Sequence, residues 1–273
     1  MGGRQTVKAA PAAVIALALA VSAVASPGDR RSHDLYVLAG QSNMSGRGAL
    51  AELTARERVA DPRIRLYGND GRWREALDPL DDASNQIDSV SSDRQAAVGP
   101  GLTFARTLVR MRGRPVALVP CAKGGSAIAE WTPGPDRRAL YGACVARTRE
   151  AGGRPAGLLW YQGESDARLA AAQDWGQRFA ALIAAFRTDV DAPRLPVVFV
   201  QIADRPRMDA DRYPGWATVQ DQQARLSLPC VAMVSARALD RNPDDLHLTT
   251  GAQRILGRRI ATAMAALLRN GCR

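Results

Sequence analysis

Five short apolar runs recur along the chain, and each has the length and composition of a buried strand. The runs cover residues 35–39, 116–120, 157–161, 197–202 and 231–235. Each run is apolar at odd and even positions alike, which is typical of strands that are covered on both faces. The pattern therefore predicts a five-stranded parallel sheet buried between helices.

Longer segments with a helical spacing of apolar residues alternate with these runs. Helices are expected over residues 102–111, 137–151, 168–188, 217–226 and 251–268. In the last segment the apolar residues recur every three or four positions, and Thr250 with Gln253 matches a capping box at its start. Strands that alternate with helices predict a three-layer α/β/α sandwich with right-handed crossovers.

Residues 68–100 interrupt this regularity. They are rich in Asp, Ser, Asn and Gly, and they lack a clear strand or helix pattern. Long insertions without secondary structure in a compact domain tend to be binding loops. The segment is therefore expected to be either a binding loop or a mobile surface loop without a role.

The first 25 residues have the pattern of an export signal. Arg4 and Lys8 precede an apolar run over residues 9–25 that contains no acidic residue, and residues 23–25 form an A-x-A cleavage site. A membrane anchor is the alternative, although 17 residues are marginal for a bilayer core of about 30 Å. We expect cleavage after Ala25, which leaves residues 26–273 as one domain without a membrane segment.

Four cysteines follow the signal segment, and their even number in an exported chain indicates two disulfides. Cys121 ends the second apolar run and Cys144 lies in the helix after it, so these two are expected to pair. Cys230 opens the fifth run and Cys272 ends the last helix, which favours the second pair. No C-x-x-C pair occurs and the chain has only 2 His, so a zinc site is not expected.

The formal net charge of +10 comes from 35 Arg and 2 Lys against 27 acidic residues. The basic residues are scattered and form neither a stripe nor a nucleic-acid-reading motif. Diffuse positive charge favours solubility and weak attraction to anionic polymers. A nucleic-acid partner is therefore not expected.

Residues with catalytic chemistry follow the predicted strands. Ligands of open α/β sheets bind beyond the carboxyl ends of the strands, and Ser42 follows the first run there. His247 stands before the last helix, whereas the only other histidine, His33, precedes the first run and should lie at the opposite edge. A serine, an imidazole and a carboxylate together are the inventory of a serine hydrolase. Asp244 can fold back to the His247 ring within one turn, whereas Asp245 should point away.

Four motifs together resemble the SGNH hydrolase superfamily. They are Gly-Gln-Ser-Asn-Met-Ser-Gly-Arg-Gly at 40–48, Lys-Gly-Gly-Ser at 123–126 with Glu130 and Trp131 after it, Trp-Tyr-Gln-Gly-Glu-Ser-Asp at 160–166, and Asp-x-x-His at 244–247. Within the superfamily they are similar to the carbohydrate acetylesterases, including the acetylxylan esterase and sialate O-acetylesterase group. The resemblance implies a flavodoxin-like α/β fold and one SGNH-type esterase domain over residues 26–273.

The resemblance also implies roles for single residues. It makes Ser42 the nucleophile, His247 the base and Asp244 its orienting acid. The oxyanion hole would use the backbone N–H groups of Ser42 and of Gly125 or its neighbour Gly124. The superfamily's Gly-x-Asn-Asp block reads Gly-Glu-Ser-Asp at 163–166, so its oxyanion Asn is replaced. We therefore expect the third donor to be Gln162, with Ser165 as the fallback.

Five further residues are candidates for contact with the substrate: Gln41, Asn43, Arg47, Trp131 and Glu164. Structural roles are the alternatives for four of them. Asn43 would then shape the nucleophile turn, Arg47 would anchor a loop, and Glu164 would hold loops through hydrogen bonds. Trp131 is suited either to stacking on a sugar ring or to anchoring its own loop.

The expected function is that of a secreted or periplasmic, monomeric serine esterase. It would remove O-acetyl groups from a carbohydrate, such as acetylated xylan or sialic acid, through an acetyl-serine intermediate without metal or cofactor. A lipid or acyl-ester hydrolase of the same superfamily is one alternative, and it would need an apolar acyl groove. A catalytically silent carbohydrate-binding protein is the other.

Overall fold

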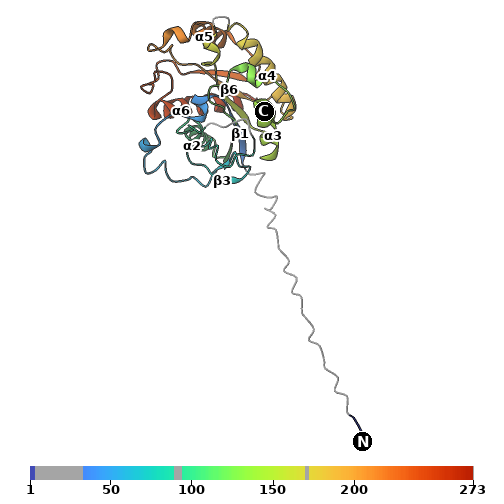
Figure 1. Cartoon of the computed structure of the whole chain (residues 1–273). Coiled ribbons are helices and arrows are strands. Elements are labelled where there is room, and N and C mark those ends of the chain that lie inside the picture. Colours follow the sequence, from blue (N-terminus) through green and yellow to red (C-terminus); the bar gives the residue numbers. More distant parts are fainter. Residues whose placement is uncertain (4–32, 89–93, 170–171, 273) are drawn as a thin grey trace. The chain divides into compact units, whose positions relative to one another are not determined.

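The sheet at the centre of the fold has seven strands in the order β3-β2-β4-β1-β5-β6-β7. Three of them, β1, β3 and β6, are labelled in Figure 1. The computed structural model describes residues 1–3, 33–88, 94–169 and 172–272. Nearly all of the predicted signal segment therefore lies outside the described residues. No helix within the described ranges combines the length and the apolarity that crossing a bilayer requires.

All five predicted strands are present, and they pair in parallel with one another. They are β1 (Asp34–Gly40), β4 (Val116–Pro120), β5 (Gly157–Tyr161), β6 (Val197–Gln201) and β7 (Val231–Ser235). The predicted count of five was too low, because β2 (Ile64–Tyr67) pairs in parallel with β4, and β3 (Trp73–Glu75) pairs antiparallel with β2. These two strands are short, and β3 is an edge strand without a buried residue, so neither produces an apolar run.

The helices form two layers over the sheet. Helices α2 (Gly101–Arg112) and α6 (Thr250–Arg269) pack together on one face. The other face carries α3 (Leu140–Glu150), α4 (Trp175–Asp189) and α5 (Trp216–Arg225), with α3 and α4 opposite α2 and α6 in Figure 1. The three-layer α/β/α prediction is thus confirmed.

Two helices begin later than predicted. Helix α3 starts after a turn in which Ala139 N donates to Asp136 O over 2.9 Å. Ahead of α4, Asp166–Arg168 forms a short 3₁₀ turn, and Ala167 O accepts from Gly215 N over 2.9 Å. The Ala167 carbonyl therefore accepts a hydrogen bond from a distant segment and not from the next turn of a helix, and the 3₁₀ turn ends at Arg168.

The start of α6 also differs from the prediction, because its N-cap is Thr249 and not Thr250. Thr249 Oγ1 accepts from Ala252 N over 3.2 Å, which satisfies one of the free N–H groups of the first turn. Gln253 does not complete a capping box, since its Nε2 donates to Asn43 O over 3.1 Å. Gln253, which matched a capping box in the sequence, therefore makes a tertiary contact with the serine turn instead.

The strand order has a functional consequence. The five predicted strands, numbered among themselves along the chain, have the order 2-1-3-4-5, which is the flavodoxin-like order. The chain moves from β1 to β4 on one side and then returns to β5 on the other side of β1. Ligands of such sheets bind where the order reverses, which here is beyond the carboxyl ends of β1 and β5.

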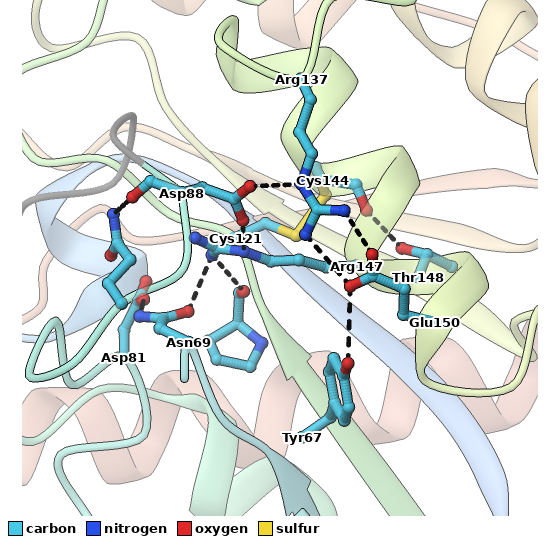
Figure 2. Close-up of polar contacts among 12 residues, drawn as sticks. Tyr67, Asn69, Asp81, Asp88, Cys121, Arg137, Cys144, Arg147, Thr148 and Glu150 are labelled. Carbon is cyan, nitrogen blue, oxygen red and sulfur yellow. Dashed lines mark hydrogen bonds and ion pairs between the residues drawn. A yellow bond between two sulfur atoms is a disulfide. The ribbon is translucent and has the colours of Figure 1, made fainter. Parts of the chain in front are cut away.

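The described part of residues 68–100 is anchored to the domain by a polar cluster, which we call the Asp88 cluster: Asn69, Asp81, Asp88, Arg137 and Arg147 (Figure 2). All of these residues are buried except Arg137, which is exposed. The carboxylate of Asp88 lies 2.6 Å from Nε of Arg137 and 2.6 Å from Nε of Arg147. Asn69 accepts from Arg147 Nη1 and donates to Asp81, each over 2.7 Å. The described part of the segment is therefore an ordered unit that includes β3, and not a structureless loop.

Both predicted disulfides are present. Cys121–Cys144 ties the end of β4 to α3 beside Arg147 (Figure 2), and Cys230–Cys272 ties the start of β7 to the end of α6. The paired cysteines are 23 and 42 residues apart. Closing loops of this size typically stabilises a fold by about 2–4 kcal/mol each.

Candidate active site

Ser42 opens a four-residue helix, α1 (Ser42–Ser45), directly beyond the end of β1. The turn before it lies tightly against β5, where Gln41 N donates to Tyr161 O over 2.8 Å. Gly40 has a φ of 128°, and a Cβ at this position would lie 2.1 Å from Tyr161 O. Glycine is therefore required there, and it lets the chain deliver Ser42 to the point where the strand order reverses.

His247 reaches the same point from a loop 205 residues further along the chain. Its Nε2 lies 3.0 Å from Ser42 Oγ, and its Nδ1 lies 2.6 Å from Asp244 Oδ2. The other oxygen of Asp244 accepts from the backbone N–H groups of Leu246 (3.0 Å) and His247 (2.9 Å). This local turn folds the carboxylate back onto the imidazole, as expected for residues three apart.

The two neighbouring aspartates differ in their partners. Burial raises the pKa of Asp244, but the hydrogen bonds from His247 and Leu246 outweigh it, and the net effect is a lowered pKa. Asp244 therefore carries its charge beside the imidazole at neutral pH. Asp245 instead lies 2.9 Å from Arg241 and accepts from the backbone N–H of Arg207. Only one of the two carboxylates thus contacts His247.

A cavity of about 430 Å³ opens beside Ser42 and His247. Six other residues selected from the sequence line it: Gln41, Arg47, Gly124, Gly125, Glu164 and Ser165. Gly124 and Gly125 belong to the turn after β4, which is fixed to the serine turn because Lys123 N donates to Gly40 O over 2.9 Å. The cavity thus brings together residues of all four sequence motifs.

Six lining residues were not selected from the sequence: Arg94, Gln95, Lys123, Arg168, Tyr213 and Leu246. Arg94 and Gln95 belong to the insertion for which a binding loop was one of the two predicted alternatives, and Arg168 stands two residues beyond the third motif. Tyr213 comes from a segment without any motif, and the guanidinium of Arg168 lies 5.9 Å from the centre of its ring. Only the fold reveals that this tyrosine is near the cavity.

The cavity is rich in positive charge. Arg47, Arg94, Lys123 and Arg168 line it, and Glu164 is the single carboxyl group among its described lining residues. Burial raises the pKa of Glu164 to about 7, although a hydrogen bond from Asn43 favours the ionised form. The cavity is therefore suited to a polar ligand that carries negative charge.

Gln162 is not placed to be an oxyanion donor, contrary to the prediction. Its side chain is fully buried, and its Nε2 donates to Ser126 O over 3.1 Å and to Asp166. Its Oε1 accepts from Trp175 Nε1 over 2.9 Å. Both hydrogens and the oxygen of the amide are thus used within the protein, and Gln162 does not line the cavity.

Trp131 and Asn43 are also not placed to contact a substrate. Trp131 is 2% exposed, its Nε1 donates to Ser126 Oγ over 3.0 Å, and its ring packs edge-on against Trp160. It anchors its loop, which was the structural alternative. Asn43 is fully buried and bonded on all sides, so it shapes the serine turn instead of facing the cavity.

Metal ligands do not gather in the described part of the chain, where no group of three or more His, Cys, Asp or Glu side chains is arranged to hold an ion. Apolar side chains are scarce at the cavity, since Leu246 and Tyr213 are the large nonpolar residues among its described lining. The described lining of the cavity is therefore better matched to a polar ligand such as a sugar than to a long apolar acyl chain.

The fold and the site together define the class of protein: a mostly parallel α/β sandwich with the architecture of SGNH carbohydrate esterases. A family model described as "carbohydrate esterase, sialic acid-specific acetylesterase" matches residues 32–266. The chain belongs to this family.

Individual relatives agree with this assignment. A probable carbohydrate esterase of Arabidopsis thaliana is 34% identical over 249 residues, covering 85% of this chain and 90% of the relative. The crystal structure of the Arabidopsis protein matches with a TM-score of 0.73 at 33% identity, covering 85% of this chain and 97% of that one. A carbohydrate acetylesterase from Xanthomonas citri shares the fold with a TM-score of 0.65 at 24% identity, covering 87% of this chain and 56% of that one.

Proposed function

We propose that this protein is a serine-dependent carbohydrate O-acetylesterase. The observation that carries the proposal is the continuous contact from Ser42 Oγ to His247 Nε2 (3.0 Å) and from His247 Nδ1 to Asp244 (2.6 Å). A serine hydroxyl is a weak nucleophile until an imidazole takes its proton, and a carboxylate orients that imidazole and stabilises its charged form.

In the proposed reaction, Ser42 Oγ attacks the acetyl carbonyl while His247 Nε2 accepts the hydroxyl proton. The N–H groups of Ser42 and Gly125 stabilise the oxyanion of the tetrahedral intermediate. His247 then gives the proton to the departing sugar oxygen, which leaves an acetyl group on Ser42. Water hydrolyses this ester by the same steps in reverse, and acetate is released.

Gln41 replaces Gln162 as our candidate for the third oxyanion donor. Its Oε1 accepts from the N–H groups of Gly163 (3.4 Å) and Ser165 (3.3 Å), which orients the amide. The residue lines the cavity next to Ser42, so its NH₂ group is the end available to a ligand. Loss of one such donor typically costs about 100- to 1,000-fold in kcat, and Gln41→Leu should show a loss of this size.

The substrate of the proposed enzyme is an acetylated acidic sugar of the sialic acid type. Four cationic side chains line the cavity against one carboxyl group, and a charge-assisted hydrogen bond to a sugar carboxylate contributes about 1.5–3 kcal/mol. Acetylated xylan, when neutral, would not use these side chains. The description of the family as sialic acid-specific supports the same choice.

Export of the protein is part of the proposal. The signal pattern over residues 1–25 supports it, and two disulfides are typical of an oxidising compartment. The release of the mature chain to the periplasm or to the medium, and its monomeric state, stay predictions.

Acetate release is the decisive experiment. The purified protein should hydrolyse 4-nitrophenyl acetate, and Ser42→Ala should abolish that activity while sugar binding persists. O-acetylated sialic acid should then be a better substrate than acetylated xylan. A protein that binds sugars but releases no acetate would instead be a silent binding protein.

The cationic side chains give a sharper test of the substrate. Lys123→Ala and Arg168→Ala should each raise KM for an acetylated acidic sugar about tenfold and leave 4-nitrophenyl acetate hydrolysis nearly unchanged. Arg225→Ala, at an exposed arginine of α5 outside the cavity, is the matched control. If the wild type and these variants each had the same KM for an acetylated acidic sugar as for an acetylated neutral sugar, the acidic substrate would be ruled out.

A further inference from the structure

The buried side chain of Asn43 joins the serine turn to the loop that carries His247. Its Nδ2 donates to Leu246 O (3.4 Å) and its Oδ1 accepts from Leu248 N (3.0 Å). These two backbone groups belong to the residues on either side of His247. Asn43 itself follows Ser42 directly, so one side chain spans the distance between the two reacting residues.

Glu164 sets the orientation of this amide. Its Oε1 accepts from Asn43 Nδ2 over 2.8 Å, and both residues are buried, at 2% exposure or less. An amide has distinct donor and acceptor ends, and a carboxyl oxygen at Nδ2 holds Oδ1 towards Leu248 N. Gln253 adds a further contact by donating to the backbone oxygen of Asn43 over 3.1 Å.

We propose that Asn43 and Glu164 are positioning residues that hold the His247 loop at reacting distance from Ser42. This inference rests on the proposed function, because it assigns a task that only a Ser42–His247 reaction needs. The loop requires support because it lies at the surface, where the side chain of Asp244 is 50% exposed. A misplacement of about 1 Å between reacting groups can cost about 100-fold in rate.

The pair can be tested by exchanging its two functional groups. Asn43→Asp places two acidic groups against each other, which cannot both ionise at this distance. At pH 8 it should lower kcat about 100-fold with little change in KM. The double variant Asn43→Asp/Glu164→Gln restores one amide facing one carboxylate, although not the longer bond to Leu246 O, and it should recover at least about tenfold of the lost kcat.

A matched control exists in the Asp88 cluster. Asn69 Nδ2 donates to Asp81 Oδ1 over 2.7 Å in a buried amide–carboxyl pair (Figure 2), and neither residue lines the cavity. Asn69→Asp should lower Tm and leave kcat of the folded protein within about twofold of the wild type. If it lowers kcat as much as Asn43→Asp does, general destabilisation explains both effects and the proposal is wrong.

A second measurement does not depend on the sugar. The rate at which a fluorophosphonate probe labels Ser42 reports the reactivity of the serine, and it should fall in Asn43→Asp and recover in the double variant. Wild-type labelling without acetate release from any sugar would contradict the proposed substrate and leave the positioning role intact. A folded Asn43→Asp variant that labels at the wild-type rate, or a double variant no faster than Asn43→Asp, would overturn the positioning role. A wild-type protein that does not label at Ser42 would overturn both.

Discussion

The Asn43–Glu164 pair at the active site and the Asp88 cluster each contain a buried carboxyl group, but the partners of the two carboxyl groups differ. The Asp88 side chain is 1% exposed and lies between two guanidinium groups at 2.6 Å (Figure 2). Glu164 is 2% exposed and accepts from the neutral amide of Asn43. Burial raises the pKa of Glu164 to about 7, so its protonated and ionised forms are both populated near neutral pH.

The difference indicates what each region is built for. Charges that are buried and paired hold segments in place, and removing one partner leaves the other uncompensated at a high cost. Glu164 is instead joined to a neutral amide by a hydrogen bond, and the charged group that contacts the His247 ring is Asp244. We therefore expect substitutions in the Asp88 cluster to affect stability, and substitutions at the site to affect activity.

Removal of the reacting groups should give the largest effect and the clearest separation. Ser42→Ala and His247→Ala should each lower kcat for an acetyl ester by about 10⁶-fold, because the nucleophile or its base is lost. Tm should change little, since neither side chain carries the packing of the core. Steady-state kinetics and thermal unfolding of the same samples test this. A Ser42→Ala variant that keeps wild-type activity would show that another residue attacks the ester.

The second largest effect on kcat is expected at the two aspartates before His247, where only one of the two substitutions should be damaging. Asp244→Asn removes the charge at 2.6 Å from His247 Nδ1 and favours the wrong tautomer, so kcat should fall about 10⁴-fold. Asp245→Asn is the control, because Asp245 contacts Arg241 instead of His247, and its kcat should fall less than about tenfold. The reverse order would show that Asp245 orients the imidazole.

Arg147→Met should lower stability and leave kcat unchanged, whereas the Ser42, His247 and Asp244 variants should lower kcat and leave stability nearly unchanged. It leaves the buried Asp88 with one partner fewer and should destabilise the fold by about 3–5 kcal/mol, or about 10 °C in Tm for a domain of this size. The folded fraction should keep its kcat. Urea unfolding and kinetics measure both, and the double variant Arg147→Met/Asp88→Leu should regain part of the loss. A stable Arg147→Met protein with low kcat would contradict the division between the two regions.

The sequence predicts the parts of this molecule that depend on local pattern. Five strands, both disulfides and the three-layer fold follow from apolar runs and element ends, because buried strands produce the strongest periodic signal. The contact of Asp244 with His247 was also predictable, since three residues fit one turn. The edge strand β3 and its neighbour β2 were missed because strands of three or four residues carry little apolar signal, and β3 has no buried residue.

The direction of a side chain beyond a strand is not encoded locally. Gln162 and Gln41 each lie within a motif. Trp175 of α4 holds Gln162 in the core through a hydrogen bond, whereas Gly163 and Ser165 hold the amide of Gln41 at the cavity. The same limit applies to Trp131, which packs on Trp160 in β5. Such contacts join residues far apart in the sequence, so they become visible only when the fold is known.

The smallest expected effect tests the proton affinity of Glu164 itself. Its pKa is about 7 in the folded protein, against an ordinary value of 4.5, so the folded state binds a proton more tightly than the unfolded state does. Below pH 4.5 both states are protonated and the group has no effect on stability. Between pH 4.5 and about pH 7 the unfolded state is ionised while the folded state keeps its proton, so stability falls by about 3 kcal/mol in total, and above this range both states are ionised and the fall ends.

Glu164→Gln should remove this dependence, because an amide does not titrate and still offers an oxygen to Asn43. Between pH 5 and pH 8 the free energy of unfolding of the wild type should therefore fall by about 2–3 kcal/mol more than that of Glu164→Gln. Urea unfolding of both proteins at the two pH values measures this, and taking the difference cancels the other titrating groups. Parallel pH dependences would mean that Glu164 is already ionised at pH 5. A cation would then have to compensate it, and the contrast with Asp88 would disappear.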